Sequence, residues 1–341
     1  MEDVAPARVR LTVDEYRSLA FSALARIGYD AEEAAIVAEH VLDAALCGYD
    51  YSGVPKILNV FEHPQLRKPR AHMRILHETP VSTSYDGGNN LGMVTMYHVT
   101  QTAISKAREH GFAVVGVNNS WESGRGAHYV EMVARADLIG IHPLSATPRV
   151  APPGGAVAAL GTNPIAVAFP TTRDPFVIDI GTSAFMFTDL IFRIRSGEQL
   201  PEGVAIDSDG KPTRDPAAAR KGALLSFGGH RGFALAMAMQ GFGILAGAGA
   251  DFDKTHGFLM LAIKPDLLMP IDDYKRDMSE MLERIKATPR QAGVEEIRLP
   301  SERSFRERAI RSREGLVIDR TMYDALNSLP QGRLPDKTHG A

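Results

Sequence analysis

The sequence predicts an α/β protein of the α+β type, with a mostly antiparallel central sheet and a helical unit formed by both chain ends. Amphipathic helical segments alternate along the chain with short β-prone runs such as Ile165–Phe169 and Phe176–Ile180. The turns beside these runs are short and rich in glycine and proline. Such turns favour antiparallel neighbours over parallel strands, which need helical crossovers.

Helical signals open the chain. Residues 12–15 form a capping box before an amphipathic run that reaches about Arg26. Residues 30–33 repeat this device before a helix that reaches about Leu46. A third helix is expected over residues 90–111, with its last glycine as the C-terminal cap.

The later elements follow from the same two periodicities of hydrophobic side chains. We expect buried strands over residues 112–118, 138–142 and 258–263, helices over 129–136 and 272–286, and an edge strand over 291–299. The arginine-rich residues 301–313 could form a solvated helix face or an anion site, and the solvated face is favoured. Residues 331–341 are expected to be a disordered tail.

Residues 232–250 carry no charge over nineteen positions, which is close to the length that crosses a membrane. The segment is rich in glycine and alanine, and Gln240 lies near its centre. These residues favour a tightly packed buried helix over a membrane span. The Gly-x-Gly pieces after Gly241 lie inside this apolar run, so they do not form the glycine fingerprint of a Rossmann fold.

Length and composition limit the classes of function. The chain has 341 residues, 44% hydrophobic and 23% charged, so it can bury a large core and divide into two or more domains. Its 38 basic residues against 41 acidic ones argue against a nucleic-acid partner. The single cysteine, Cys47, suits a reducing compartment, and the N-terminal residues lack the apolar run of a signal peptide. We therefore expect a cytoplasmic protein.

The most informative segment covers residues 150–183. It joins two Gly/Pro turn clusters to the strands Ile165–Phe169 and Phe176–Ile180, and the second strand ends in Asp179 followed by Gly181-Thr182-Ser183. Strand ends of this kind offer backbone N–H groups and hydroxyls to a phosphate or a carboxylate. Two ordinary surface turns remain an equal interpretation from local chemistry alone.

Five short motifs follow one another along the chain. They are Gly161-Thr162-Asn163-Pro164, Asp179 with Gly181-Thr182-Ser183, Leu200-Pro201-Glu202-Gly203, Asp209-Gly210-Lys211-Pro212-Thr213 and Gly228-Gly229-His230-Arg231-Gly232. In this order they resemble the malate/L-lactate dehydrogenase family, over about residues 30–300. That family also contains ureidoglycolate dehydrogenase, diketogulonate reductase, sulfolactate dehydrogenase and Δ1-piperideine-2-carboxylate reductase.

The resemblance implies a nicotinamide-dependent oxidoreductase on a non-Rossmann fold, which uses NAD or NADP on a small carboxylate. It implies a cofactor-binding domain over residues 116–264. A helical region for substrate binding and dimerisation would cover residues 1–115 and be completed by residues 265–330. In relatives the active site lies near a dimer interface, so a homodimer is expected. No histidine stands in metal-ligand spacing with a second ligand, so no metal is expected.

The resemblance also implies which residues hold the cofactor. The strand end contributes Asp179, Gly181, Thr182 and Ser183, and the last glycine motif contributes His230, Arg231 and Gly232. Arg231 stands where the family has a lysine and keeps a cation for the cofactor. Beyond the Leu-Pro turn the family's chain returns to the cofactor, which gives three weaker candidates, Ser301, Glu302 and Arg303.

The reacting centre departs from the family at residues 48–56. Most members carry Asp-Ser-His-Gly there, and the histidine protonates the carbonyl oxygen or imine nitrogen, because its pKa lies near working pH. In this chain Ser52 stands at the histidine position and Tyr51 at the serine position. Lys56 replaces the arginine that usually clamps the substrate carboxylate, so a point charge replaces a bidentate fork.

A second departure lies at residues 119–126, where the family usually reads Asn-Ser-Asn-His-Phe-Gly. Glu122 stands at the histidine of that motif, and Arg125 follows where a small residue is common. Glu122 could act as an acid if burial raised its pKa, and Arg125 could hold the substrate carboxylate. Asp189, whose counterpart orients the acid in some relatives, has no histidine to orient here.

Two function classes stay open. The first is an NAD(P)H-dependent oxidoreductase acting on a 2-oxo, 2-hydroxy or cyclic 2-imino carboxylate with a non-histidine proton donor. Tyr51 could be that donor with Lys56 lowering its pKa, and His63 is a further candidate. The imine is slightly favoured, because a protonated iminium needs no strong acid from the protein. The second class is an inactive dinucleotide-binding protein, in which Glu122 and Arg125 pair with each other.

Overall fold

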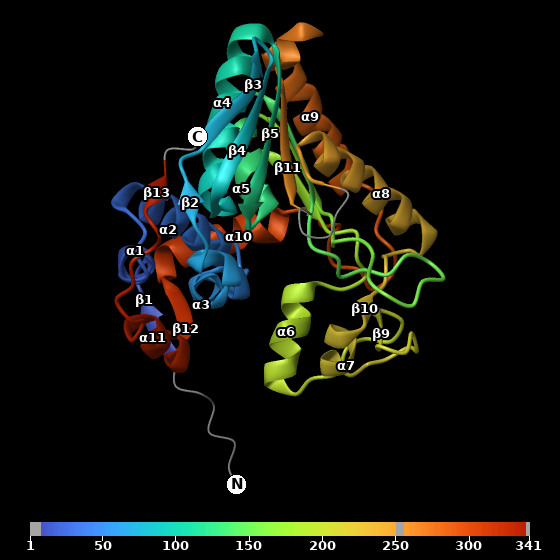
Figure 1. Cartoon of the computed structure of the whole chain (residues 1–341). Helices are drawn as coiled ribbons and strands as arrows, with labels where there is room; N and C mark the ends of the chain where they lie inside the picture. The colour runs from blue at the N-terminus through green and yellow to red at the C-terminus, as the bar shows by residue number, and fades with distance from the viewer. Residues whose placement is uncertain (1–7, 250–255, 339–341) are drawn as a thin grey trace.

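A seven-stranded mixed sheet forms the centre of the computed structural model, which describes residues 8–249 and 256–338. Its strands stand in the order β3-β4-β5-β11-β6-β7-β8 (Figure 1). Among them, β4 and β5 pair in parallel and the other five neighbouring pairs are antiparallel, as the short turns predict. In sheet order the strands are β3 (Arg74–Thr79), β4 (Ser82–Leu91), β5 (Phe112–Trp121), β11 (Gly257–Ile263), β6 (Ile139–Ser145), β7 (Ile165–Phe169) and β8 (Phe176–Ile180).

Helices cover both sides of the sheet. Helices α4 (Gly92–His110) and α5 (Gly126–Ala134) lie on one side, and α8 (His230–Leu245) and α9 (Ile271–Lys286) lie on the other (Figure 1). Helix α4 ends at Gly111, whose φ of 85° is a left-handed conformation that glycine adopts readily, as predicted. Helix α5 begins at Gly126, earlier than the expected helix over residues 129–136, and this brings its first turn against the end of β8.

One hydrophobic cluster joins the central sheet to its helices, and the two ends of the chain meet in a second one. This second cluster, the terminal cluster, packs α1 (Val13–Arg26), α2 (Ala31–Leu46), α3 (Pro55–Glu62) and α11 (Arg320–Asn327) together. Strand β1 (Arg8–Leu11) pairs antiparallel with β12 (Leu316–Asp319). The predicted capping box of α1 is present, with Thr12 and Glu15 bonding to each other's backbone N–H groups. Asp30 caps α2 through the amide of Glu33 at 2.9 Å. The domain boundaries stay a prediction. Strands β3 and β4, which come before residue 112, belong to the central sheet.

A small third cluster follows β8 in the chain. Helices α6 (Phe187–Ser196) and α7 (Pro216–Lys221) pack with the short strands β9 (Ala205–Ile206) and β10 (Ala223–Leu224) around buried leucines. The core of this cluster contains Val150, Leu190, Leu200, Val204, Ala205, Ala219 and Leu224. In Figure 1 it lies on the opposite side of the view from the terminal helices.

Two expectations near the C-terminus are wrong. Residues 291–299 form no strand, because no described strand lies beside them and Gly293 turns the backbone at a φ of 79°. The tail expected to be disordered is ordered through residue 338, while residues 339–341 lie outside the described part. Leu334 is buried in the terminal cluster, and β13 (Lys337–Thr338) pairs with β2 (Arg70–Ala71).

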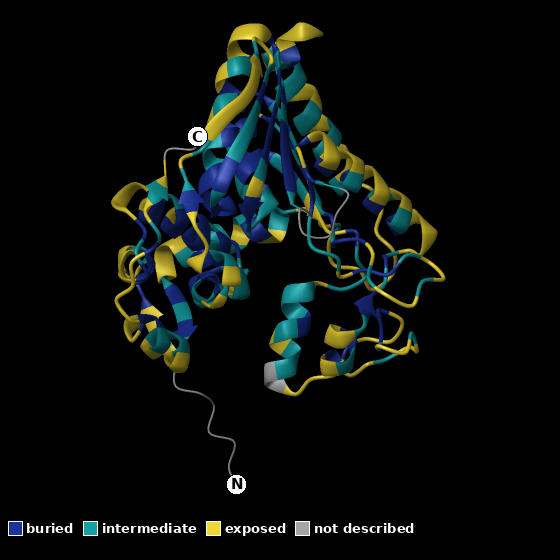
Figure 2. Cartoon of the chain, in the orientation of Figure 1, coloured by how far each residue is buried: buried dark blue, intermediate teal, exposed yellow. Residues whose placement is uncertain are grey.

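Helix α8 is only half buried, which differs from the tightly packed helix expected over residues 232–250; residue 250 itself lies outside the described part. One face packs against the sheet through Gly232, Ala236, Met239 and Gly243. The opposite face exposes apolar side chains, among which Leu245 is 68% exposed. Parts of this helix are yellow in Figure 2, the colour of exposed residues. Among the described residues, no helix combines the length and the apolar character needed to cross a membrane.

Candidate active site

The loop between α2 and α3 is pinned to the first helix. A 3-10 turn, η1 (Asp50–Ser52), carries Tyr51 and the half-buried Ser52, whose amide donates to the Tyr49 carbonyl at 2.9 Å. The amide of Val54 donates to the buried hydroxyl of Tyr16 at 2.8 Å. Helix α3 then starts with Pro55 at its first turn, where a proline fits, and so presents Lys56 at its amino end.

Lys56 and Glu122 form the ion pair of the reacting centre. Nζ of Lys56 lies 3.0 Å from Oε1 of Glu122, and the two side chains are 9% and 32% exposed. Burial acts to raise the pKa of Glu122, but the Lys56 ammonium outweighs burial and holds that pKa below its ordinary value. Glu122 could donate a proton only if burial raised its pKa. That expectation is wrong, because the Lys56 ammonium stabilises the ionised carboxylate.

Arg125 is engaged with α2 and does not pair with Glu122. One of its terminal nitrogens lies 2.8 Å from Oδ2 of Asp43, its guanidinium lies 5.1 Å from the ring centre of Tyr49, and its side chain is 9% exposed. Burial opposes ionisation of Asp43, yet a hydrogen bond from His128 and the charges of Arg125 and Arg308 lower its pKa well below the usual value. The Glu122–Arg125 pair considered for the inactive alternative is thus replaced by two separate pairs.

His40 lies within electrostatic range of both ion pairs, and it was not among the site residues predicted from the sequence. Its Nε2 accepts the backbone N–H of Arg125 at 2.9 Å. Gly124 permits this approach, since its φ is 74° and a Cβ there would lie 2.2 Å from His40 Nε2. Burial lowers the pKa of His40 well below its usual value, so the ring stays neutral and can accept. A signal existed in the sequence, because His40 and Asp43 are three apart and share a helix face.

Tyr51 faces the segment after β8. Its hydroxyl donates to the sulfur of Met186 at 3.4 Å. Partial burial, together with Tyr49 and Asp189, raises the pKa of Tyr51 to about 12. The expectation that Lys56 lowers this pKa is wrong, because the Lys56 ammonium is turned to Glu122. Tyr51 is therefore a protonated phenol at neutral pH.

His63 is held by the protein at both its ring face and its edge. Its ring stacks on Trp121 with centres 4.5 Å apart and planes 11° from parallel. Its Nδ1 accepts the amide of Gln65 at 3.2 Å, which caps the 3-10 turn η2 (Pro64–Arg67). Partial burial lowers the pKa of His63. These contacts give the ring a structural role at the border of the Lys56–Glu122 pair.

The turn after β8 uses its hydroxyls inside the protein. Thr182 donates through both its amide and its hydroxyl to the carbonyl of Thr162 at 2.9 Å, and the Ser183 hydroxyl donates to the Phe185 carbonyl at 2.7 Å. The sequence suggested that these hydroxyls would donate to a phosphate, but in the structure both donate to backbone carbonyls. Gly181 is exposed, and a Cβ there would meet nothing closer than 3.8 Å, which leaves room for a ligand beside the backbone.

Asp179 joins this turn to the reacting centre. Its Oδ2 accepts the amide of Ala127 at 2.8 Å, in the first turn of α5. Loss of hydration raises the pKa of Asp179, while the Ala127 amide and the nearby Arg125 act in the opposite direction. Asp189, six residues after Ser183, instead lies 3.5 Å from Arg193 in α6.

The two predicted cofactor motifs lie side by side. The amide of Phe227 donates to the Thr182 carbonyl at 3.1 Å, immediately before the glycine motif at residues 228–232. Gly228 and Gly229 have φ values of 53° and 60°, and α8 begins at His230. In the first turn of α8 the amides of Arg231 and Gly232 already donate to the Gly228 and Phe227 carbonyls at 3.3 and 3.0 Å, whereas the Arg231 side chain is exposed. A Cβ at Gly229 would meet nothing within 4 Å, so a charged dinucleotide fits this combination of open glycine backbone and exposed cation.

The residues after the Leu-Pro turn reach the reacting centre from the other side. Ser301 has a φ of 60° and starts α10 (Glu302–Glu314), in which Glu302 pairs with Lys286. The Arg303 guanidinium lies 5.0 Å from the ring centre of Tyr49. The favoured solvated helix face is wrong for part of this segment, because Arg308 binds Asp43 at 2.7 Å and Glu131 at 2.6 Å.

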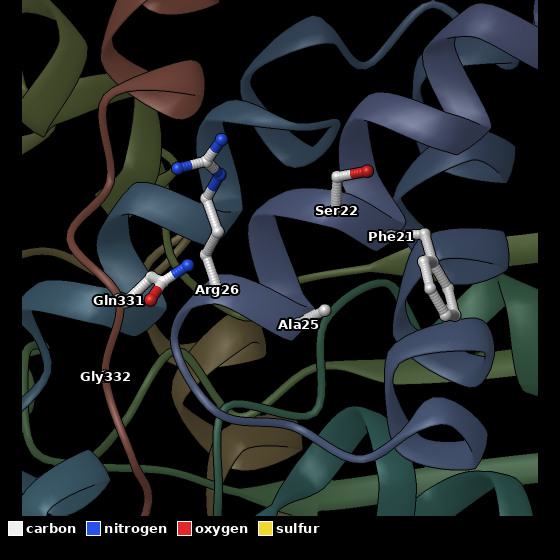
Figure 3. Close-up of a pocket in the computed structure, with 6 residues that line it drawn as sticks. All are labelled: Phe21, Ser22, Ala25, Arg26, Gln331 and Gly332. Atoms are coloured by element: carbon white, nitrogen blue, oxygen red, sulfur yellow. The ribbon is translucent and has the colours of Figure 1, made fainter.

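A pocket of about 470 Å³ lies away from all of these residues, between α1 and the C-terminal segment (Figure 3). No residue of the predicted site lines it. Its walls are formed by Phe21, Ser22, Ala25, Arg26, Gln331 and Gly332.

Comparison with known proteins identifies the family to which the chain belongs. Residues 11–327 match the family model described as malate/L-lactate dehydrogenase. The chain belongs to the malate/L-lactate dehydrogenase family. It is 32% identical over 335 residues to the malate/(S)-sulfolactate dehydrogenase of Methanothermus fervidus, with 94% of this chain and 96% of that protein covered.

Solved structures of family members share the fold. The sulfolactate dehydrogenase of Methanocaldococcus jannaschii aligns with a TM-score of 0.82 and 32% identity, over 94% of this chain and 96% of that chain. The Δ1-piperideine-2-carboxylate reductase of Pseudomonas syringae pvar. tomato aligns with a TM-score of 0.84 and 26% identity, over 94% and 99%. This chain is accordingly an NAD(P)-dependent oxidoreductase, in a family of hydroxy- and oxo-carboxylate dehydrogenases and reductases.

Proposed function

We propose that this member of the family reduces a small 2-oxo or cyclic 2-imino carboxylate, or oxidises the matching 2-hydroxy or amino acid, with NAD(H) or NADP(H). The observation that supports this most is the contact between the two halves of the site. We call residues 48–56 and 119–126 the reacting loops, and residues 181–183 and 228–232 the glycine turns. Tyr51 contacts Met186 and Asp179 accepts an amide of the first turn of α5, so the reacting loops lie next to the glycine turns. The bound nicotinamide would supply the hydride.

The protein's own side chains would bind and orient the substrate. The Lys56 ammonium stands at the amino end of α3, where a substrate carboxylate would be attracted. Arg125 is the second cation, with its direction fixed by Asp43. Tyr51 keeps its proton at neutral pH and is the proposed donor for a substrate that forms an alkoxide.

Cofactor binding and turnover test this function separately. Titration of NADH and NADPH by fluorescence and calorimetry should show binding of at least one at micromolar dissociation constants or tighter. A panel of 2-oxo acids and cyclic imino acids should then give oxidation of the bound dinucleotide. Binding without turnover on the whole panel would favour the inactive dinucleotide-binding alternative, and no binding of either dinucleotide would refute both.

The exposed face of α8 supports a homodimer. Met237 is 50% exposed and Ile244 is 53% exposed, and both share this face with Phe242 and Leu245. A row of exposed apolar side chains on a helix marks a protein–protein interface, and closed dimers are the commonest assembly. Light scattering should give twice the chain mass at micromolar concentration, and Leu245→Glu should shift it toward the monomer. A monomeric wild-type protein would contradict the proposal. We also propose a cytoplasmic location, because the single cysteine suits a reducing compartment.

A further inference from the structure

The Lys56–Glu122 pair restricts the charge of the ligand that can bind at the reacting centre. The cation at the clamp position already has a carboxylate at 3.0 Å, and this pair is mostly shielded from water. A substrate carboxylate that contacts Lys56 must share the ammonium with Glu122 or take Glu122's place. Whether such a substrate binds well depends on which group balances the negative charge of Glu122 when Lys56 contacts the substrate.

Few other charges can compensate Glu122. Besides Lys56, the groups that would stabilise the Glu122 carboxylate when charged include His63 and His256. Burial lowers the pKa of both histidines, so neither is a fixed cation at neutral pH. His40, which also lies within electrostatic range of Lys56, is kept neutral by burial, which lowers its pKa. A ligand with only negative charge would therefore leave Glu122 without a cation in a partly buried place, which is costly.

Arg125 cannot easily take over this role. Its guanidinium binds Asp43 at 2.8 Å and stacks on Tyr49. Its backbone amide is held by His40 at 2.9 Å. Turning the side chain toward Glu122 would break the stacking contact and remove one cation from Asp43. The pKa of Asp43 is held low by His128 and by its two arginine partners, against burial. The two pairs are therefore two separate sites for charge.

We infer that Glu122 determines specificity by selecting a zwitterionic substrate, a carboxylate next to a protonated imine. The substrate carboxylate binds Lys56, and the iminium N–H donates to Glu122. Each protein charge then keeps an opposite charge, and both new hydrogen bonds are charge-assisted. A 2-oxo monoanion lacks the second contact, and a dicarboxylate adds repulsion, so the same residue rejects both. This inference rests on the proposed function and refines its substrate class.

The chemistry of an iminium agrees with the protonation states of the site. Glu122 is ionised and the pKa of Tyr51 is about 12, so neither is a strong acid at neutral pH. When hydride adds to the imine carbon, the C=N π electrons become the nitrogen lone pair, and the nitrogen keeps its proton as a neutral secondary amine. The hydride and its two electrons come from the reduced nicotinamide. A 2-oxo acid instead forms an alkoxide, which takes an additional proton from a donor.

A matched pair of ligands tests the charge selection without turnover. L-Proline and cyclopentanecarboxylate share a five-membered ring and a carboxylate, but proline alone carries a positive nitrogen. Calorimetry on the wild-type protein should show proline binding about tenfold or more tightly than cyclopentanecarboxylate. In Glu122→Gln the two dissociation constants should come within about threefold of each other, since the nitrogen loses its charged partner. Glu122→Asp, which keeps the charge, should keep the preference.

Glu39→Gln is the control, because it makes the same chemical change on the exposed side of α2, where Glu39 pairs with Arg17. It should leave both ligands unchanged. Equal binding of proline and cyclopentanecarboxylate to the wild type would overturn the inference, whether or not the variants fold. So would a Glu122→Gln protein that melts normally and keeps the wild-type preference.

Turnover distinguishes failure of this inference from failure of the proposed function. With a dinucleotide bound, kcat/KM for 1-pyrroline-2-carboxylate should exceed that for pyruvate by about tenfold or more, and Glu122→Gln should reduce that ratio. If pyruvate or another 2-oxo acid is the better substrate, the enzyme is confirmed as a reductase and the role of Glu122 is refuted. If neither dinucleotide binds, the proposed function itself fails.

Discussion

The glycine turns and the reacting loops are held in place by different forces. In the glycine turns the hydrogen bonds end on backbone carbonyls, as where the Phe227 amide donates to the Thr182 carbonyl at 3.1 Å. In the reacting loops, ion pairs are added to such bonds, through Lys56 with Glu122 at 3.0 Å and Arg125 with Asp43 at 2.8 Å. The first region depends on chain conformation, and the second depends on the identity of each charged residue.

This difference explains where the chain departs from its family. A turn held by backbone bonds keeps its shape as long as glycine and proline stand at the required places, so its motif stays recognisable. A loop held by ion pairs can change only if both partners suit each other, because one buried charge without its partner is destabilising. Lys56 and Glu122 both replace the family's usual residue, and they contact each other. We interpret them as one linked exchange.

The largest effect is expected where the two kinds of constraint meet, at Gly124. Gly124→Ala would place a Cβ 2.2 Å from His40 Nε2 at a φ of 74°. Overpacking and a left-handed backbone together should lower the free energy of unfolding by about 3 kcal/mol. Urea unfolding measures this loss. Gly203→Ala is the matched control, since its φ is 77° with nothing within 4 Å, and it should lose only about 1 kcal/mol. Equal losses would show that His40 does not hold the loop.

A loss of stability of similar size should appear at low pH, because of His142 in strand β6 of the central sheet. Burial lowers the pKa of His142 from 6.5 to about 4, its Nδ1 bonds the Leu259 carbonyl at 2.7 Å, and its buried Nε2 has no acceptor among the described residues. The unfolded chain thus binds more protons between these values. Stability should fall by about 3 kcal/mol as the pH drops from about 6.5 to about 4. Thermal melts of His142→Gln should show a flatter dependence; an unchanged slope would assign it to other groups.

Tyr51→Phe probes the reacting loops without touching their ion pairs. The variant removes the hydroxyl that donates to the Met186 sulfur and keeps the ring. Turnover of 2-oxo acids should fall about a hundredfold, because the alkoxide loses its donor, while cofactor affinity stays within about twofold. Turnover of cyclic imino acids should fall much less. Single-turnover rates on both substrate classes give the comparison, and an equal loss on both would mean that the phenol positions the substrate and donates no proton.

Local patterns predicted the fold better than the contacts of the site. The sequence placed Ile165–Phe169 and Phe176–Ile180 correctly, and it identified the capping box at Thr12, because turn residues and side-chain periodicity act over a few positions. It failed for residues 291–299, since a strand also needs a neighbour, and neighbours are set by the whole fold.

The choice of ion-pair partners could not be predicted from the sequence. Glu122 and Arg125 are close in the chain, and this suggested that they pair. The structure separates them, because Glu122 has a φ of 58° and His40 holds the amide of Arg125 from 85 residues away. The spacing of His40 and Asp43 indicates that they share a face of α2, but it does not indicate that this face packs beside α5.

The smallest predicted effect lies in the glycine turn, at Thr182. Its hydroxyl is buried and donates to the Thr162 carbonyl at 2.9 Å, while its amide makes a second bond to the same oxygen. Thr182→Val keeps the shape and removes one of two hydrogen bonds, so stability should fall by about 1 kcal/mol. Dinucleotide affinity should change less than about threefold, because the hydroxyl serves the turn and not the ligand. Thr182→Ser, which keeps the hydroxyl, is the control for both measurements. A loss of affinity of tenfold or more in Thr182→Val, with the turn still stable, would mean that the hydroxyl leaves Thr162 to bind the cofactor, and the glycine turns would then depend on side chains as the reacting loops do.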